Sequence, residues 1–557
     1  MKHLLRTTSR GVALAAATAL AATTLTTVGT APAHAEVPAQ TAAGWLATEL
    51  TNGLMHNPNF GGFDDYGLTI DAAFAIDAIG GNGAVIRQVR TALAPKVGSY
   101  IEYPANGAGD LHQSAGPLAK ALVFAQIAGA DGTSYGGRNL VGDLAARVSV
   151  AGPIAGRIED RTVSGDTDSF TPGVQPDSDY ANVIGQAFAA RGLAKAGSAK
   201  AASATAFLLQ QQCSAGYFRL NFAPATASAQ GCVDGAVGSA PDTDVTALAV
   251  LQLAALGGSD AKVTGAIAKA TGWLTAQQKS DGSFGGGPTT SAANANSTGV
   301  AAQALASQGA CVAAGRAAGW VKGLQVLSAS SSSPLNGELG AIAYDAAALA
   351  AAQSAGITDA TSDQWRRATS QAAPAVAFAL SASPTLAFTG PTGFQREGTT
   401  ATLKVTGVAE GDRVCVAGPG ISGTRSLVAG GSGALTTSVV LPGQTSTPTY
   451  TLTSATGTKQ VKVSVLGKAK LPVKAKKKKV SKGDKQVVRV AGLVAGEKVS
   501  VRVRNTLVDT GTANAAGVFK AKFTIKKKLA APGRPKVVAT GHFPDLRKGV
   551  TYFRVTR

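Results

Sequence analysis

Four segments of the chain begin with Asp or Asn side chains in a shared frame, and each frame runs into an almost wholly apolar stretch. Such a frame places carboxylates and amides at the starts of helices. Oxygen atoms that converge at one end of several helices could bind a cation or a hydroxyl-rich ligand. The four frames are Asp65-Tyr-Gly67, Asp177-Ser-Asp179, Asp242-Thr-Asp244 and Asn294-Ala-Asn296.

The same residues have a simpler role as helix N-caps, each of which contributes about 1 kcal/mol to stability. Capping accounts for Asp179, Asp244 and Asn296 without any ligand. The two roles are compatible, because caps on parallel helices share one mouth. We therefore place a ligand-binding site at that mouth. Its residues would be Asp65, Asp177, Asp179, Asn294 and Asn296, with Asp242 and Asp244 beside them.

The elements that position these residues repeat along the chain. A glycine lies eleven residues past the Thr or Ala of each frame, where a helix ends in a left-handed residue: Gly80, Gly192, Gly257 and Gly309. The helices between are apolar nearly all round, which indicates burial on every side. Residues 118–127 and 345–353 fit the same position. Six such inner helices alternating with outer ones predict an all-α (α/α)6 toroid over residues 36–381.

The composition changes near residue 382, where Val/Thr alternation and Gly turns predict strands. Residues 398–407 resemble 483–492, and 411–414 resemble 496–499, so this part of the chain is itself a repeat. Each unit holds about seven short strands. We therefore predict two all-β Ig-like sandwiches, at 382–467 and 468–557.

Residues 1–35 have the pattern of a signal peptide. Lys2, Arg6 and Arg10 precede an apolar stretch, and Ala33-His34-Ala35 offers a cleavage site. No later segment has about 18 uninterrupted apolar residues, so we expect no transmembrane segment in the mature protein. The protein is therefore expected to be secreted, extracellular or associated with the cell wall.

Four cysteines remain in a chain with this export pattern, and export favours disulfides. Cys213 and Cys232 flank one loop, so we expect them to pair; the state of Cys311 and Cys415 is left open. Cysteine spacing and the scarcity of His argue against zinc, and we expect no metal site and no cofactor. Asp160, Asp166 and Asp168 could contribute to a calcium site, but a solvated acidic loop explains them more simply.

Positive charge is concentrated at the end of the chain. The whole chain has a net charge of +20, whereas residues 459–557 alone hold 26 Lys or Arg and 4 Asp or Glu. Anionic wall polymers or a membrane surface are the partners that this charge predicts, and sparse aromatics argue against nucleic acid. The candidate polyanion-binding residues are Lys476, Lys477, Lys478, Lys479, Lys526, Lys527 and Lys528.

The helical region, roughly residues 40–380, resembles the squalene cyclase/protein prenyltransferase repeat superfamily. The resemblance rests on Gly272-Trp273-Leu274, Asp281-Gly-Ser-Phe284-Gly and Asp242-Thr-Asp244-Val-Thr-Ala. In cyclases of that superfamily, the middle Asp of Asp-x-Asp-Asp-Thr-Ala supplies the proton that starts polyene cyclisation. The resemblance thus implies Asp244 as the general acid, with Asp242 before it. Val245 replaces the third carboxylate, and the inner helices carry few aromatic rings. The zinc ligands of the prenyltransferase branch have no counterpart.

Three functions remain. The first, which the sequence favours, is a secreted, non-catalytic envelope protein whose toroid binds a ligand and whose basic β domain attaches to anionic polymers. The second is a terpenoid cyclase-like enzyme that uses Asp244 and Asp242 for proton-initiated cyclisation. The third is a carrier for a small, cobalamin-like cofactor, an analogy based on architecture alone. A cavity lined by aromatics, with Asp244 facing it, would favour the enzyme.

Overall fold

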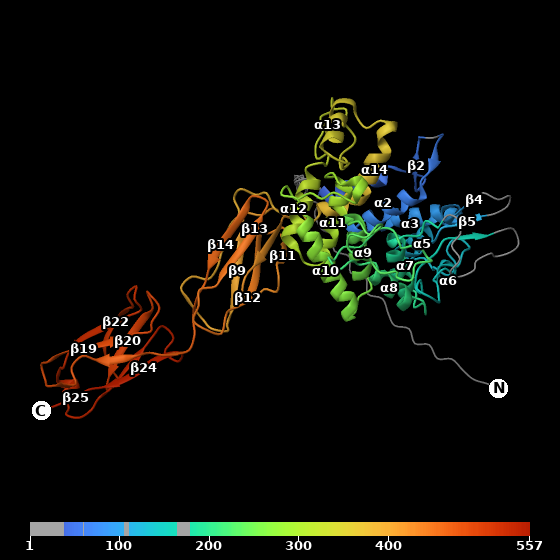
Figure 1. Ribbon diagram of the computed structural model, residues 1–557. Coiled ribbons are helices and arrows are strands. Elements are labelled where there is room, and N and C mark those ends of the chain that lie inside the picture. The colour runs from blue at the N-terminus through green and yellow to red at the C-terminus, as the bar shows by residue number, and fades with distance from the viewer. Residues whose placement is uncertain (1–37, 60, 105–110, 164–178) are drawn as a thin grey trace, which may run out of the picture. The chain divides into compact units, whose positions relative to one another are not determined.

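The computed structural model describes residues 38–557 apart from residues 60, 105–110 and 164–178. The expected signal peptide, 1–35, lies outside the described residues. Helices account for most of residues 38–376, and strands replace them from residue 387 onward (Figure 1). Within the described part of the chain, no helix combines the length and the apolar character needed to cross a bilayer.

The centre of the helical region is a closed ring of helices. Its members contact one another in chain order, and the last contacts the first. The ring helices are α2 (Tyr66–Ile79), α5 (Ala115–Ile127), α7 (Val183–Lys195), α9 (Thr243–Ala254), α11 (Ala295–Ser307) and α14 (Asp359–Val376). Because this ring is lined with small residues, its helices approach closely. A Cβ added to Gly299 would lie only 2.4 Å from the Cα of Ala372 on α14.

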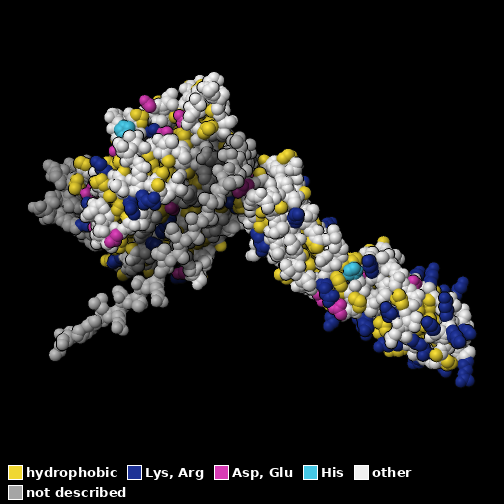
Figure 2. All heavy atoms as spheres, turned by 180° about the vertical axis from the view of Figure 1, so that it is seen from behind, with side chains coloured by type: hydrophobic (Ala, Val, Ile, Leu, Met, Phe, Trp, Pro, Cys, Tyr) yellow, Lys and Arg dark blue, Asp and Glu magenta, His cyan; other side chains and the backbone are white. Residues whose placement is uncertain are grey.

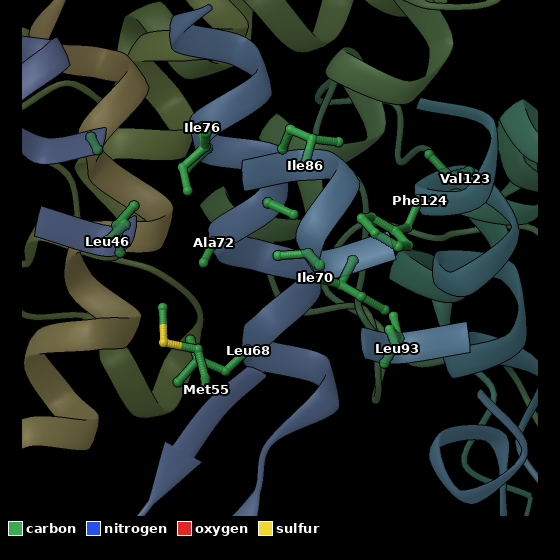
Figure 3. Close-up of a cluster of buried hydrophobic side chains, with 14 of the residues drawn as sticks. Leu46, Met55, Leu68, Ile70, Ala72, Ile76, Ile86, Leu93, Val123 and Phe124 are labelled. Carbon is green, nitrogen blue, oxygen red and sulfur yellow. The ribbon is translucent and has the colours of Figure 1, made fainter. Parts of the chain in front are cut away.

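Outer helices pack against the ring, as in an α/α toroid. Each contacts one or more ring helices near it in the ring, and α1 contacts α14, where the chain closes on itself. The outer helices are α1 (Pro38–Thr48), α3 (Gly83–Leu93), α4 (Val97–Ile101), α6 (Leu140–Ala146), α8 (Ala201–Gln210), α10 (Ala261–Gln277) and α12 (Cys311–Lys322). Figure 3 shows how buried side chains from this layer and the ring meet: Leu46 of α1, Ile70 and Ile76 of α2, Leu93 of α3 and Phe124 of α5.

One inner helix was predicted wrongly. The segment 345–353 forms α13 (Ala346–Ala355), which is capped by Asp345 as expected but has Ala352 as its one fully buried residue. The sixth position in the ring belongs to α14, whose Trp365 is 1% exposed. Capping signals start a helix wherever they occur, whereas a place in the ring requires burial on all sides.

Hydrogen bonds to threonine hydroxyls repeat around the ring. Thr69, Thr246 and Thr298 follow three of the frames, the remaining frame has Ala181 instead, and Thr369 lies in α14. The Thr69 hydroxyl of α2 accepts from the backbone N–H of Met55 at 2.9 Å. Thr246, Thr298 and Thr369 do the same for preceding loops, also at 2.9 Å. The two ends of the helical region are also linked, because Gln325 Nε2, just after α12, donates to the carbonyl of Pro38 in α1 at 2.7 Å. A buried N–H without a partner is costly. These bonds therefore fix the position of each of the four helices, along its axis, relative to the loop that precedes it.

Short strands lie in the loops of the helical region. They form two small sheets, each with three strands in sequence order. The strands are β1 (Leu50–Thr51), β2 (Leu54–Asn57), β3 (Phe63–Asp64), β4 (Glu102–Pro104), β5 (Leu111–Gln113) and β6 (Arg161–Val163).

The first β region encloses its own apolar core between two main sheets, ordered β11-β10-β13-β14 and β12-β9-β7. A further pair, β15-β8, is parallel. The strands are β7 (Ala387–Thr389), β8 (Phe394–Arg396), β9 (Thr400–Thr406), β10 (Arg413–Ala417), β11 (Arg425–Val428), β12 (Ala434–Val440), β13 (Thr449–Ser454), β14 (Gly457–Lys462) and β15 (Ser464–Leu466).

The second β region has a separate core and repeats the same order of parts. Its sheets are β16-β24-β23-β20-β21, β17-β19-β22 and β18-β25. The strands are β16 (Ala469–Lys470), β17 (Val473–Ala475), β18 (Lys479–Val480), β19 (Lys485–Val490), β20 (Lys498–Val503), β21 (Thr506–Thr512), β22 (Phe519–Thr524), β23 (Lys536–Thr540), β24 (Arg547–Tyr552) and β25 (Arg554–Val555).

Two disulfides join the four cysteines. Cys213 pairs with Cys232 in the loop between α8 and α9, the pair that the sequence predicts. Cys311 at the start of α12 pairs with Cys415 of β10, which links the helical region to the first β region. Both of the latter cysteines are buried, with Leu380 beside them.

Candidate active site

The two carboxylates of the Asp242-Thr-Asp244 frame have different roles at the start of α9. Asp242 is the N-cap: its Oδ1 accepts from the backbone N–H groups of Asp244 at 2.9 Å and Val245 at 3.1 Å. Asp244 lies in the first turn and caps nothing. Its Oδ1 atom is buried without an ordinary hydrogen-bond partner. A buried oxygen without a partner can still accept a hydrogen bond from another group.

The surroundings of Asp244 keep a proton on it. Burial, the largest cause, raises the pKa of Asp244 to about 6; the Asp242 charge adds to the rise, and the Ser297 hydroxyl opposes it. Burial also raises the pKa of Asp242, although the N–H groups that it caps work against this. Asp244 is therefore half protonated near pH 6 and still about one-tenth protonated at pH 7, which suits a general acid in mild conditions.

A run of glycines covers both carboxylates. A Cβ placed on Gly286 would come within 2.6 Å of Asp244 Oδ2, and one on Gly287 within 2.3 Å of Asp242 Oδ2. Only residues without a side chain allow the backbone this close. Tyr344 also lies near, since after burial the Asp244 charge is the next cause that raises the Tyr344 pKa.

Asp244 opens into a cavity of about 410 Å³ at the centre of the ring. All six ring helices contribute to its lining, together with Tyr100 of α4, and the size is typical of small-molecule sites. The lining residues are Asp71, Tyr100, Gly116, Pro117, Lys120, Asn182, Ile184, Gly185, Phe188, Asp244, Leu248, Val300 and Gln371.

A second ionisable pair faces the same cavity. Lys120 Nζ of α5 lies 2.7 Å from Asp71 Oδ1 of α2, and it also donates to the carbonyl of Gly67 at 3.1 Å. Burial disfavours the Lys120 charge, but Asp71 and Tyr100 more than offset this and raise the Lys120 pKa. Burial also raises the pKa of the Tyr100 phenol to about 12. The cavity thus holds a fixed ion pair and a neutral phenol besides the titrating acid Asp244.

Aromatic rings form part of the apolar lining. Phe188 of α7 reaches the cavity and stacks on Phe74 of α2, with ring centroids 5.8 Å apart. Ile184, Leu248 and Val300 complete an apolar surface next to the polar groups. This interior is neither shallow nor lined by alanine alone, although it has fewer rings than a fully aromatic cavity.

The other residues predicted for the mouth are held by protein partners. Asp65 caps α2 through Leu68 N at 2.8 Å, and its Oδ2 accepts from Arg367 at 2.5 Å. Asn294 caps α11 through Ser297 N at 2.8 Å. Asn296, like Asp244, lies in the first turn and has a buried Oδ1 atom without an ordinary partner. Asp177 lies outside the described residues.

Asp179 was predicted to cap α7, and this is wrong. Asn182 is the cap, with its Oδ1 accepting from Gly185 N at 3.1 Å. Asp179 instead forms a buried ion pair with Arg157, with 2.7 Å between Nη2 and Oδ2. The prediction that Asp244 and Asn296 act as caps is also wrong, because Asp242 and Asn294, the first residues of their frames, are the caps.

Of the three acids considered for calcium, Asp160 is described, and it is held by protein contacts. Asp160 accepts from Ala115 N at 2.8 Å and Tyr180 N at 2.9 Å, and its other partner is His112 at 3.2 Å. Asp166 and Asp168 fall outside the described residues. Among those that are described, no three His, Cys, Asp or Glu side chains are grouped to hold a metal ion.

The predicted polyanion residues are all exposed. Lys476 to Lys479 surround the start of β18, and Lys526 to Lys528 follow β22. Figure 2 shows Lys and Arg side chains, in dark blue, gathered on the C-terminal β region. One of them, Lys477, lies 3.7 Å from Asp484.

Sequence reasoning missed Lys120, Asp71, Tyr100 and Gln371 in the cavity. The first two carried a usable signal. Lys120 is a lone charge in an otherwise apolar helix, and Asp71 shares its largely apolar helix with one other charge, Asp77. A charge in such a place must be paired or face a polar cavity, because an isolated buried charge is too costly.

Comparisons with known proteins concern the helical region. No protein-family model matches the chain, and no curated protein matches it. Among solved structures, a protein from Actinoplanes is 18% identical, with a TM-score of 0.40, over 61% of this chain and 98% of that one. The type II terpene cyclase MstE from Scytonema is 16% identical, with a TM-score of 0.39, over 61% and 97%. An unsaturated glucuronyl hydrolase specific for heparin is 12% identical, with a TM-score of 0.41, over 61% and 95%. These likenesses concern the toroid fold alone.

The neighbours with a stated activity are enzymes, and this finding contradicts the prediction of a non-catalytic envelope protein. That prediction was based on the missing third carboxylate at Val245 and on the scarcity of aromatic residues. In the structure, burial raises the pKa of Asp244 to about 6 without a third carboxylate.

Proposed function

We propose that the helical region is an enzyme of the terpenoid cyclase type, with Asp244 as the general acid. The observation that carries the proposal is the buried, unpartnered Oδ1 atom of Asp244 beside the central cavity, on a side chain whose pKa burial raises to about 6. Asp242 supports it by fixing the start of α9 and by adding the charge that helps to retain the proton.

The reaction that fits this site transfers the Asp244 proton to a carbon of an alkene. The π electrons form the new C–H bond and leave a carbocation, which a second double bond attacks to close a ring. Loss of a neighbouring proton to a base then restores neutrality, so the net change is an isomerisation. The faces of Phe188 and Tyr100 can stabilise positive charge near the cavity wall.

The Lys120–Asp71 pair would bind the polar end of such a substrate. The Lys120 ammonium is held in place by Asp71 Oδ1 at 2.7 Å and by the carbonyl of Gly67 at 3.1 Å. It could therefore donate a hydrogen bond to a substrate from a fixed position. A long apolar chain with a polar head would then lie with its tail against Ile184, Leu248 and Val300.

The test is proton incorporation. Geranylgeranyl dihydroxybenzoate is named as the substrate of MstE, and we would offer it to this chain with a series of shorter polyprenyl compounds. The full chain in D2O should yield cyclised product carrying one solvent-derived deuterium. Asp244→Asn should reduce turnover by at least about a hundredfold, in the range of losses for general acids.

Asp260→Asn is the matched control. Asp260 caps the outer helix α10 through Lys262 N and lies at an exposed position. It should retain full turnover. Product formation that survives in Asp244→Asn, or product without deuterium, would rule out proton-initiated cyclisation at Asp244.

The finer assignments of the chain are also proposals. We propose that the ring is a six-hairpin (α/α)6 toroid, and that the β regions are Ig-like sandwiches. The boundaries are 36–381, 382–467 and 468–557, and residues 1–35 are removed on export. The order of the ring helices and the two separate β cores support the first two, and the two disulfides support export. The cofactor-carrier alternative stays a prediction.

A further inference from the structure

The outer face of the sheet β17-β19-β22 carries a regular array of cations. Alternate residues along a strand point to the same side, and here the inward residues are buried Val473, Val488, Val490 and Ala521. Of the outward residues at the intervening positions, Val487 and Thr524 are half-buried and uncharged, and six others are exposed and basic. They are Lys474 on β17, Lys476 just after it, Lys485 and Arg489 on β19, and Lys520 and Lys522 on β22.

The register places like charges directly opposite one another. Lys474 is paired with Arg489, and Arg489 is paired with Lys520, so one row of three cations crosses the whole sheet. Strands lie about 4.8 Å apart, and same-side residues repeat about every 6.8 Å along a strand. Cross-strand like charges destabilise a sheet. The row therefore costs stability and calls for a role other than folding.

Few carboxylates offset this array. In the described part of the chain, none of the six side chains takes part in an ion pair. One carboxylate, that of Asp509, reaches the array, where its Oδ2 accepts from the backbone N–H of Lys522 at 2.9 Å. Asp484 lies 3.7 Å from Lys477, which is outside the array.

Protection of sheet edges does not explain the array. Lys on an edge strand discourages aggregation, and β17 and β22 are the edges of this sheet. Arg489, however, lies on the central strand β19. The other large sheet of the same region carries a shorter array: its Lys536 faces Tyr552, and its Lys548 faces Thr540 on one side and Lys470 on the other, so a like-charge pair but no row of three crosses it.

We propose that this face binds a linear phosphodiester polymer. Rows of cations at about 5 by 7 Å match a chain of anions that runs along the sheet. Five of the six cations are Lys, which binds phosphate oxygens as a point charge. No aromatic side chain stands among the rows to stack a base, which sets nucleic acid aside. Val487 is the single apolar residue between the rows, too little to insert into a lipid surface.

The experiment compares two triple variants of the full chain with equal loss of charge. The face variant is Lys474→Gln, Arg489→Gln and Lys520→Gln. The control is Lys498→Gln, Lys536→Gln and Lys548→Gln on the opposite sheet. The probe is a glycerol-phosphate polymer titrated at low and at high salt, with poly-glutamate and phosphatidylglycerol vesicles as the other arms.

The face variant should bind the glycerol-phosphate polymer at least about tenfold more weakly at low salt, and the control less than about threefold. Its melting temperature at low salt should rise, because the opposed charges are gone, while a merely structural role would lower it. Equal losses in the two variants would show that net charge alone is at work. Equal or tighter binding to poly-glutamate or to vesicles would overturn the phosphodiester assignment.

Discussion

Replacing Asp244 with Asn should stabilise the helical region, and only above a certain pH. Burial raises the Asp244 pKa from 3.8 to about 6 in the folded protein. Each pKa unit corresponds to about 1.4 kcal/mol, so ionising this group costs the folded state about 3 kcal/mol relative to the unfolded chain. Asn has a similar shape and does not ionise, and so it avoids that cost.

The pH window follows from these two pKa values. Below pH 3.8 the carboxyl is protonated in both states, and wild type and variant differ little. Between pH 3.8 and 6 the unfolded chain releases its proton first, so wild-type stability falls as the pH rises. Above pH 6 the cost is constant. The difference between Asp244→Asn and wild type should thus grow from about 0.5 kcal/mol at pH 4 to about 3 kcal/mol at pH 7.5.

Tryptophan fluorescence isolates this difference during urea unfolding. All four Trp residues belong to the helical region, so their emission reports that region and not the β regions. Asp260→Asn, at the exposed cap of α10, should change stability by less than about 0.5 kcal/mol at both pH values, since Asn caps as well as Asp. A gain in Asp244→Asn that is the same at pH 4 and pH 7.5, or a loss at pH 7.5, would refute the reasoning.

Two further predictions concern packing and cross-links. Gly299→Ala should destabilise the helical region by about 1–3 kcal/mol in the same urea assay, because its Cβ would press on Ala372 of the next ring helix. Gly265→Ala, with open space around it on α10, should instead gain about 0.5–1 kcal/mol; similar effects at the two sites would contradict the close packing. Cys311→Ser, which opens a loop of 104 residues, should lower stability by about 4–5 kcal/mol, against about 3 kcal/mol for Cys213→Ser, whose loop spans 19. Calorimetric melts with and without reductant check this, and the reverse order would contradict the loop-length argument.

Local signals were enough to predict most of the ring. A capping residue and a closing glycine bracket α2, α9 and α11 at the predicted positions. In α7 the prediction was wrong at both ends, because Asn182 is the cap and Gly192 lies inside a helix that continues to Lys195. The local signals did not predict α14 as a ring helix, because Arg366 and Arg367 make its sequence resemble that of a surface helix. These arginines reach Glu49 and Asp65, at 2.6 and 2.5 Å. Whether a charge has such a partner depends on contacts about 300 residues away, which periodicity cannot show.

The cavity was predictable in part. Asp244 was identified through its motif, whereas Lys120 could be found only by asking why an apolar helix tolerates a single charge, and Asp71 by asking which carboxylate pairs with it. The pairing of Cys311 with Cys415 depends on how α12 and β10 come together. No spacing rule within either element contains that information.

The two-residue spacing of the frame explains why one motif serves both folding and chemistry. The first residue accepts from the free N–H groups of the first turn and is committed to the helix, as Asp242 and Asn294 are. The second already lies inside the helix, where side chains tilt toward the N-terminus and hence toward the mouth of the ring. Asp244 and Asn296 occupy this second position, and both have a buried oxygen without an ordinary partner. An amide has no acidic proton to give, so of these two only the copy that ends in Asp244 can act as an acid.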